Sequence, residues 1–275
     1  MITKRIDLYQ HFGLERKPGS SGYLNGYLFQ DAEEGTKLIR PAILVVAGGG
    51  YSHVSEREMK PVALKYAEDG FSCFVLEYST APISYPTQLL EGVMAMLYIR
   101  QNAEDLSIDE NHIAALGFSA GAHLCGMLAT LSDNELQETP FYKSLNKARP
   151  DAVVLGYPVV SAIHSPHKGS FANISGGDER LYALLSIEKR VAQNVSPAFI
   201  WGCLDDPVVH SDNGFLLAQA YKKAGVPFEY HLFESCNGIH GLSICEKETL
   251  YENETVKAWV QLSKKWLYNR GFLVQ

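Results

Sequence analysis

The sequence lacks the marks of several protein classes. No apolar run approaches the length of a membrane span, and no apolar stretch follows the first charges, Lys4 and Arg5, so no secretory signal is visible. Acidic residues outnumber basic ones, 31 to 24, and the formal net charge is −7. Without a basic block to neutralise phosphates, nucleic acid is not an expected partner, and neither is a membrane.

Cysteine is scarce. The five cysteines form an odd set at no spacing typical of a disulfide framework. We expect buried free thiols in a reducing compartment, and the predicted location is the cytoplasm. Neither C-x-x-C nor a helical H-x-x-x-H is present, and the histidines are scattered, so no metal site is predicted.

Short apolar runs alternate with segments of helical periodicity over most of the chain. Continuous apolar runs are typical of a parallel sheet that is covered on both faces. Strands are predicted over 42–47, 71–78, 113–118, 152–157, 197–202 and 228–233, with helices over 57–69, 86–102, 120–131, 212–223 and near the C-terminus. The predicted fold class is α/β, with residues 1–275 forming one domain around a mostly parallel central sheet.

Two segments depart from this alternation. Residues 22–29 alternate apolar and polar positions between turn residues, which indicates antiparallel edge strands before the parallel core. Residues 161–196 interrupt the pattern after Pro158 with glycines, histidines and a short amphipathic piece. We interpret this segment as a small cap or lid insertion.

The most informative motif is Gly117-Phe118-Ser119-Ala120-Gly121, between a predicted strand and a predicted helix. The pattern G-x-S-x-G at such a junction is the nucleophile elbow of serine hydrolases, in which a tight turn lifts the serine hydroxyl out of the backbone. The pentapeptide alone is weak evidence, since it also arises by chance. Its context must therefore supply a base and an acid.

A serine nucleophile needs a base within hydrogen-bond reach, held by a third group, and in this arrangement the order is serine, acid, histidine. Asp205 and Asp206 follow the strand at 197–202, and His240 follows the strand at 228–233. Asp206 is the preferred acid because Pro-Val-Val behind it would anchor the loop, whereas Asp205 is left to stabilise the turn. His231 and His210 are read as structural.

The glycines after the strand at 42–47 predict an oxyanion hole. Backbone N–H groups stabilise the tetrahedral intermediate, and glycine lets such amides turn inward. The expected donors are Gly49, Gly50 and Ala120, the residue after the nucleophile. A dinucleotide fingerprint and a phosphate loop do not fit the residues that follow Gly50, but a plain tight turn remains an alternative.

The chain resembles the α/β-hydrolase esterases of the acetyl-esterase and xylan- or feruloyl-esterase type, related to the hormone-sensitive-lipase group. The resemblance implies Ser119 as nucleophile, His240 as base and Asp206 as orienting acid, with amides of Gly49, Gly50 and Ala120 in the oxyanion hole. It rests on motifs in order along the chain: Gly48-Gly49-Gly50-Tyr51, Arg57-Glu58-x-x-Pro61-Val62-Ala63, Glu77-Tyr78-Ser79-x-Ala81-Pro82, Gly117-Phe118-Ser119-Ala120-Gly121-x-His123-Leu124, Asp205-Asp206-Pro207-Val208-Val209 and His240-Gly241.

One departure concerns the glycine run. Lipase-like relatives have a histidine before it that helps to hold the loop, and this chain has Ala47. The sequence therefore leaves open how the loop is braced. Tyr51, Ser52 and Arg57 are expected to line the acyl or sugar side of the site.

The resemblance implies a serine carboxylesterase that hydrolyses short-chain acyl esters, with acetyl esters of carbohydrates preferred, through an acyl-enzyme. The expected partner is a small-molecule ester such as an acetylated sugar, and the reaction needs no cofactor. Alternatives are an aryl-formamidase or small-peptide hydrolase with the same residues, and a non-catalytic small-molecule receptor on a hydrolase scaffold. No heptad pattern indicates an oligomeric state.

Overall fold

A computed structural model describes residues 1–29, 37–132 and 135–275. Over these ranges the chain forms a sheet of eight strands in the order β1-β2-β4-β3-β5-β6-β7-β8. β2 is antiparallel to both of its neighbours, and the other pairs are parallel. The strands are β1 (Ile2–Asp7), β2 (Tyr23–Leu28), β3 (Arg40–Val46), β4 (Ser72–Glu77), β5 (Ile108–Phe118), β6 (Ala152–Gly156), β7 (Ala198–Cys203) and β8 (Phe228–Phe233).

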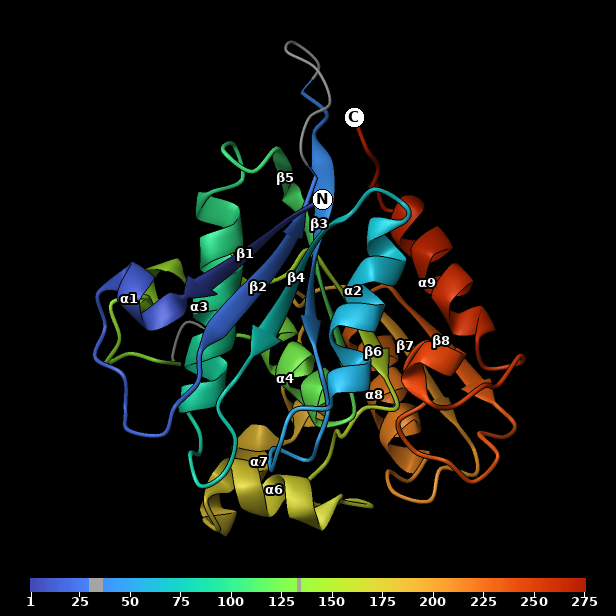
Figure 1. The fold of residues 1–275 in the computed structure, drawn as a ribbon. Coiled ribbons are helices and arrows are strands. Elements are labelled where there is room, and N and C mark those ends of the chain that lie inside the picture. Colours follow the sequence, from blue (N-terminus) through green and yellow to red (C-terminus); the bar gives the residue numbers. More distant parts are fainter. Residues whose placement is uncertain (30–36, 133–134) are drawn as a thin grey trace.

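Helices cover both faces of this sheet (Figure 1). Ile43 and Val45 of β3 pack in one core with α2 and α9, whereas Leu44 and Val46 face the opposite core with α1, α3, α4 and α8. The alternation of β3 side chains between two dry layers explains why its sequence is continuously apolar. The helices are α1 (Leu8–Phe12), α2 (Lys60–Ala67), α3 (Thr87–Gln101), α4 (Ala120–Ala129), α5 (Leu145–Ala148), α6 (Lys168–Ser175), α7 (Tyr182–Leu185), α8 (Asp212–Ala224) and α9 (Ala258–Tyr268).

The predicted α/β class and mostly parallel sheet are confirmed, and each predicted strand overlaps an observed one. The helix predicted over 57–69 is divided. A 3₁₀ turn (Glu56–Glu58) comes first, and Met59, with φ −102° and ψ −107°, breaks the chain direction before α2 begins. Pro61 in the first turn of α2 fits this restart, because proline needs no N–H partner there. The five cysteines are free and buried, as expected.

Within residues 161–196, α6 and α7 lie beyond the carboxyl ends of the parallel strands, below α4 (Figure 1). Asn173 Nδ2 donates to the Gly50 carbonyl at 2.8 Å, and Tyr85 N–H donates to the Ile174 carbonyl at 2.7 Å. The segment is therefore tied to the loop that follows β3. Whether it acts as a lid stays a prediction.

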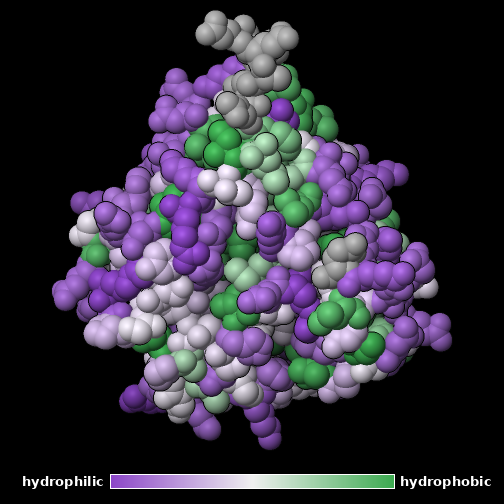
Figure 2. Space-filling view, viewed as in Figure 1, coloured by the Kyte–Doolittle hydropathy of each residue, from purple (hydrophilic) through white to green (hydrophobic). Residues whose placement is uncertain are grey.

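Hydrophilic residues cover most of the face seen in Figure 2, and apolar residues occur there in small separate groups. Among the helices of the described ranges, none combines the length and apolar character needed to cross a membrane.

Candidate active site

Ser119 lies at the sharp turn between β5 and α4, with φ 52° and ψ −118°. This left-handed backbone is rare for a residue with a side chain, and such strain is typical of functional turns. A Cβ atom on Gly121 would collide with the carbonyl oxygens of Val46 and Ala47, and one on Gly117 with the carbonyl of Gly121. The two glycines of the motif thus allow α4 to cross β3 and β5 at close range.

The structure brings Ser119, His240 and Asp206 into one hydrogen-bonded chain. His240 Nε2 lies 3.0 Å from Ser119 Oγ, and His240 Nδ1 lies 2.8 and 3.0 Å from the two Asp206 oxygens. Because a carboxylate only accepts, Nδ1 carries the proton, and the lone pair of Nε2 faces the serine hydroxyl. The Asp206 side chain is only 4% exposed, so its hydrogen bond with His240 is shielded from solvent.

Two backbone amides fix the aim of Asp206. Val208 N–H and Val209 N–H donate to its Oδ1 at 2.9 and 3.0 Å, and Val209 is buried. Asp205 instead points to the other end of the loop that carries His240, where it accepts from Ser235 Oγ and from Cys236 N–H, each at 2.6 Å. The hydrogen bonds from Ser235 and Cys236 lower the pKa of Asp205. The two neighbouring aspartates therefore have different partners.

His231 and His210 lie outside this chain of contacts. His231 pairs with Glu229 and stacks on Phe199, and His210 pairs with Asp212. Their placement agrees with the structural roles expected for them.

The backbone amides of Gly48, Gly49 and Gly50 in the glycine loop (residues 48–51) have different surroundings. Gly48 N–H donates to Glu58 Oε2 at 2.7 Å. Gly49 adopts φ +125°, and a Cβ there would collide with the His53 carbonyl. In the part of the chain that the structure describes, the N–H groups of Gly49, Gly50 and Ala120 donate to no protein acceptor. These amides remain available to an oxyanion.

A cavity of about 270 Å³ opens over the serine. Ser52 and Arg57, two of the residues expected to contact substrate, line it, and Arg57 Nε also donates to the Gly241 carbonyl at 2.8 Å. Most of the residues that line it are polar, with histidine and serine side chains beside the reacting groups. It is formed by Gly49, Gly50, Ser52, His53, Ser55, Arg57, Glu58, Ser119, His167, Val208 and His240.

The expectation that Tyr51 contacts substrate is wrong. Tyr51 has φ 58°, and this turn directs its ring into the core, where the side chain is fully buried. Its hydroxyl donates to Nδ1 of His123, 2.7 Å away, and His123 Nε2 in turn donates to the Leu185 carbonyl. Tyr51 therefore links the glycine loop through α4 to the segment 161–196.

The buried His123 makes stability depend on pH. Burial lowers its pKa from 6.5 to about 4, so the folded state binds fewer protons than the unfolded state between these values. We expect the contribution of His123 to the free energy of unfolding to be fully present above pH 6.5. This contribution, about 3 kcal/mol, is lost as the pH drops toward 4. Urea unfolding of wild type at pH 7 and pH 5 measures the slope.

The matched variants are His123→Gln, which removes the titrating ring, and His210→Gln, at an exposed histidine. His123→Gln should lower stability at pH 7 and flatten the slope, while His210→Gln should leave the slope as it is. An unchanged slope in His123→Gln would assign the pH dependence to another group.

Five cavity residues were missed by the sequence prediction, namely His53, Ser55, Glu58, His167 and Val208. His167 caps α6, and its Nδ1 accepts from Ser170 N–H, so the neutral ring carries its proton on Nε2. Burial lowers the pKa of His167, as does the nearby His240, which favours this neutral form. The sequence shows that Ser170 lies three residues after His167, a spacing that allows the cap, but nothing in the sequence places these cavity residues beside Ser119.

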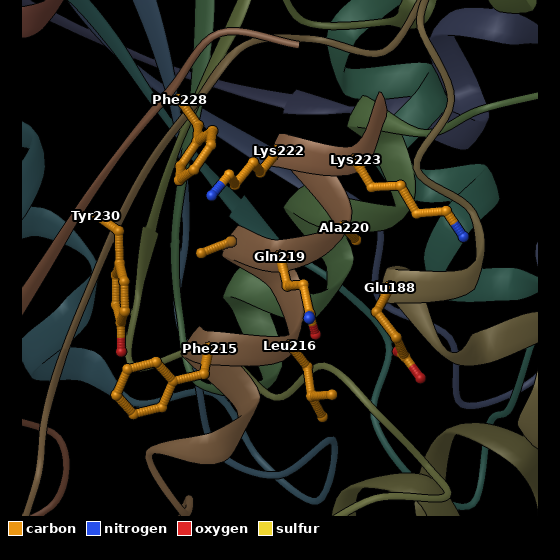
Figure 3. Close-up of a pocket in the computed structure, with 10 residues that line it drawn as sticks. Glu188, Phe215, Leu216, Gln219, Ala220, Lys222, Lys223, Phe228 and Tyr230 are labelled. Atoms are coloured by element: carbon orange, nitrogen blue, oxygen red, sulfur yellow. The ribbon is translucent and has the colours of Figure 1, made fainter. Parts of the chain in front are cut away.

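A wider hollow of about 1130 Å³ lies on the outer side of α8 and β8. Phe215, Phe228 and Tyr230 form one side of it, Lys222 extends from α8 toward Phe228, and Lys223 and Glu188 lie on the opposite side (Figure 3). None of the residues that line it belongs to the serine–histidine–aspartate chain, so it is separate from the candidate active site.

Comparison with known proteins supports the fold and the family of the chain. The model of the BD-FAE family matches residues 28–221. Endo-1,4-beta-xylanase B of Butyrivibrio fibrisolvens is 36% identical over 216 residues, 76% of this chain and 33% of that protein. Acetylxylan esterase of Xylanibacter ruminicola is 30% identical over 210 residues, 73% of this chain and 40% of that protein. The chain thus spans only a third to two fifths of these curated relatives.

A solved structure covers more of the chain. The acetyl ester-xyloside bifunctional hydrolase of Caldicellulosiruptor lactoaceticus is 35% identical, with a TM-score of 0.79 over 91% of this chain and 89% of that one. Together with the strand order and the family match, this similarity shows that the chain belongs to the BD-FAE family and has the α/β-hydrolase fold.

Proposed function

We propose that the protein is a serine carboxylesterase that hydrolyses short-chain acyl esters of carbohydrates, with acetyl esters preferred. The proposal is carried by one arrangement: the chain Ser119–His240–Asp206 stands beside amides that have no acceptor among the described residues. This is what acyl transfer requires, namely a nucleophile, a base held in one tautomer, and donors for the developing oxyanion.

In the first step Ser119 Oγ attacks the ester carbonyl while His240 Nε2 takes the hydroxyl proton. The carbonyl oxygen becomes an oxyanion that accepts from the N–H groups of Gly49, Gly50 and Ala120. The intermediate collapses to an acyl-enzyme as the imidazolium gives its proton to the leaving alkoxide. Water, activated by the same Nε2, then attacks the acyl-enzyme and releases the acid and free Ser119. Asp206 stabilises the imidazolium in both steps.

The size and the polarity of the cavity support the substrate class. At about 270 Å³ it lies just below the usual range for small-molecule sites, which favours a short acyl group. Polar side chains lie around it, namely those of Ser52, His53, Arg57 and His167. They can form hydrogen bonds with the hydroxyl groups of a carbohydrate alcohol. The relatives whose names contain acetylxylan esterase and acetyl ester-xyloside hydrolase point the same way.

A substrate panel tests the proposal. We expect rapid hydrolysis of p-nitrophenyl acetate, roughly tenfold or greater loss of kcat/KM from the butyrate to the octanoate ester, and release of acetate from acetylated xylo-oligosaccharides. Fluorophosphonate should label the protein. A protein that neither labels nor cleaves any short ester would be a receptor, and preference for an aryl formamide or an aminoacyl anilide would move it to another hydrolase class.

A further inference from the structure

Two loops that are far apart in sequence must be aligned for this chemistry. The glycine loop follows β3, and the histidine loop (residues 234–245) follows β8. The glycine loop contacts Glu58, and the histidine loop contacts Arg57, the preceding residue of the same 3₁₀ turn. The Glu58 carboxyl is nearly fully buried, at 2% exposure, and lies at the cavity wall. A buried carboxyl with no step of its own in the reaction calls for an explanation.

Glu58 contacts the glycine loop directly and reaches the histidine loop through Tyr157. Its Oε2 accepts from Gly48 N–H at 2.7 Å, and its Oε1 accepts from the Tyr157 hydroxyl at 2.8 Å. Tyr157 Oη accepts in turn from Ser243 N–H at 3.1 Å. The Tyr157 ring also packs edge-on against the His240 ring, with centroids 5.0 Å apart.

Arg57 makes the second connection to the histidine loop. Ser243 Oγ donates to the Arg57 carbonyl at 2.7 Å, and Arg57 Nε donates to the Gly241 carbonyl at 2.8 Å. Because Gly241 directly follows His240, the hydrogen bond from Arg57 holds the backbone next to the base. The two side chains and one carbonyl of this turn therefore connect to both loops.

We propose that Glu58 is a positioning residue, which holds the glycine loop and the histidine loop in register so that the oxyanion donors and His240 meet the same reacting carbonyl. The inference rests on the proposed esterase function and adds to it a residue outside the triad. It also answers the question left by Ala47: Tyr78 Oη donates to the Ala47 carbonyl at 2.8 Å and Glu58 accepts from Gly48 N–H, so both polar groups of the peptide between Ala47 and Gly48 are held.

The donors around Glu58 match this role. Burial raises the pKa of Glu58, while the hydrogen bonds from Tyr157 and Gly48 favour its charged form. Burial and the neighbouring Glu58 raise the pKa of Tyr157 well above its ordinary value, so the phenol keeps its proton and donates it. Oε2 thus accepts from the glycine loop, and Oε1 accepts from Tyr157, which contacts the histidine loop. Glutamine at this position keeps an acceptor for one loop only, and alanine keeps none.

The test compares Glu58→Gln, Glu58→Ala and Tyr157→Phe with Glu56→Ala, an exposed residue of the same turn. Assayed with p-nitrophenyl acetate well below each Tm, we expect kcat of Glu58→Ala to fall about 10- to 100-fold with KM unchanged, because misplaced donors act only in the transition state. Glu58→Gln and Tyr157→Phe should lose less, and Glu56→Ala should match wild type.

A second readout needs no ester substrate. Phosphonylation of Ser119 by fluorophosphonate also uses the oxyanion donors, so its rate should fall in the same order. If the wild type labels but cleaves no ester, the esterase proposal fails, while the labelling rates still test Glu58. Folded Glu58→Gln and Tyr157→Phe proteins with wild-type kcat and labelling rates would overturn the positioning role, whatever their loss in Tm.

Discussion

Ser119→Ala is expected to lower kcat for p-nitrophenyl acetate by roughly 10⁶-fold, the scale seen when a triad serine is removed. The variant has no atom to form the acyl-enzyme, and what remains is the contribution of the amides and of substrate binding. The fold should persist, because alanine at φ 52° and ψ −118° has the same backbone strain as the serine. Steady-state hydrolysis and circular dichroism together measure both effects.

Ser165→Ala is the matched control, because Ser165 is an exposed serine that also has a positive φ, 48°, and its hydroxyl donates to Asp212. It should keep wild-type turnover and fluorophosphonate labelling, both of which Ser119→Ala loses. Substantial ester hydrolysis by a folded Ser119→Ala protein would show that another nucleophile, or another site, carries the reaction.

The central sheet was predictable because its strands are buried on both faces, which leaves a local signal of continuous apolar runs. β1 gave no such signal. Its sequence, ITKRID, is polar and mostly exposed, and within the described ranges it pairs with β2 alone. An edge strand of this kind is defined by pairing with a segment sixteen or more residues away along the chain, a contact that local patterning does not encode.

The order of the triad residues was readable, because each follows a strand of a parallel sheet and such ends meet at one edge. Side-chain direction was not. Tyr51 lies next to Gly50 in sequence, yet its positive φ sends the ring to His123 and away from the cavity. Glu58 looked like an ordinary polar residue at a helix start, and only the tertiary contacts with Gly48 and Tyr157 give it a role.

The same limit applied to Asp205 and Asp206, which are adjacent in sequence and chemically identical. The sequence favoured Asp206 through the Pro-Val-Val that follows it. The structure adds that Asp206 contacts His240, whereas Asp205 contacts Ser235 and Cys236. Separate substitutions of Asp205 and Asp206 distinguish the effect of contact with the His240 imidazole from the effect of supporting the loop that carries it.

Asp206→Asn should lower kcat roughly 10⁴-fold, the loss known for this change in a catalytic triad. The side-chain amide of this variant donates an N–H to Nδ1, where the carboxylate accepted a hydrogen bond. The neutral imidazole therefore adopts the tautomer with its proton on Nε2. That nitrogen then cannot take the proton of Ser119, 3.0 Å away. The change is nearly isosteric, so KM and the circular dichroism spectrum should stay close to those of wild type.

Asp205→Asn is the paired control, because it makes the same chemical change one residue away. The native Asp205 carboxylate accepts from Ser235 Oγ and Cys236 N–H on the histidine loop, and the asparagine oxygen of the variant can still accept from one of them. We expect kcat to stay within about tenfold of wild type, since the loop shifts slightly while the tautomer of His240 is kept. The reverse order of losses would make Asp205 the triad acid, and equal losses would mean that loop position limits turnover more than the tautomer does.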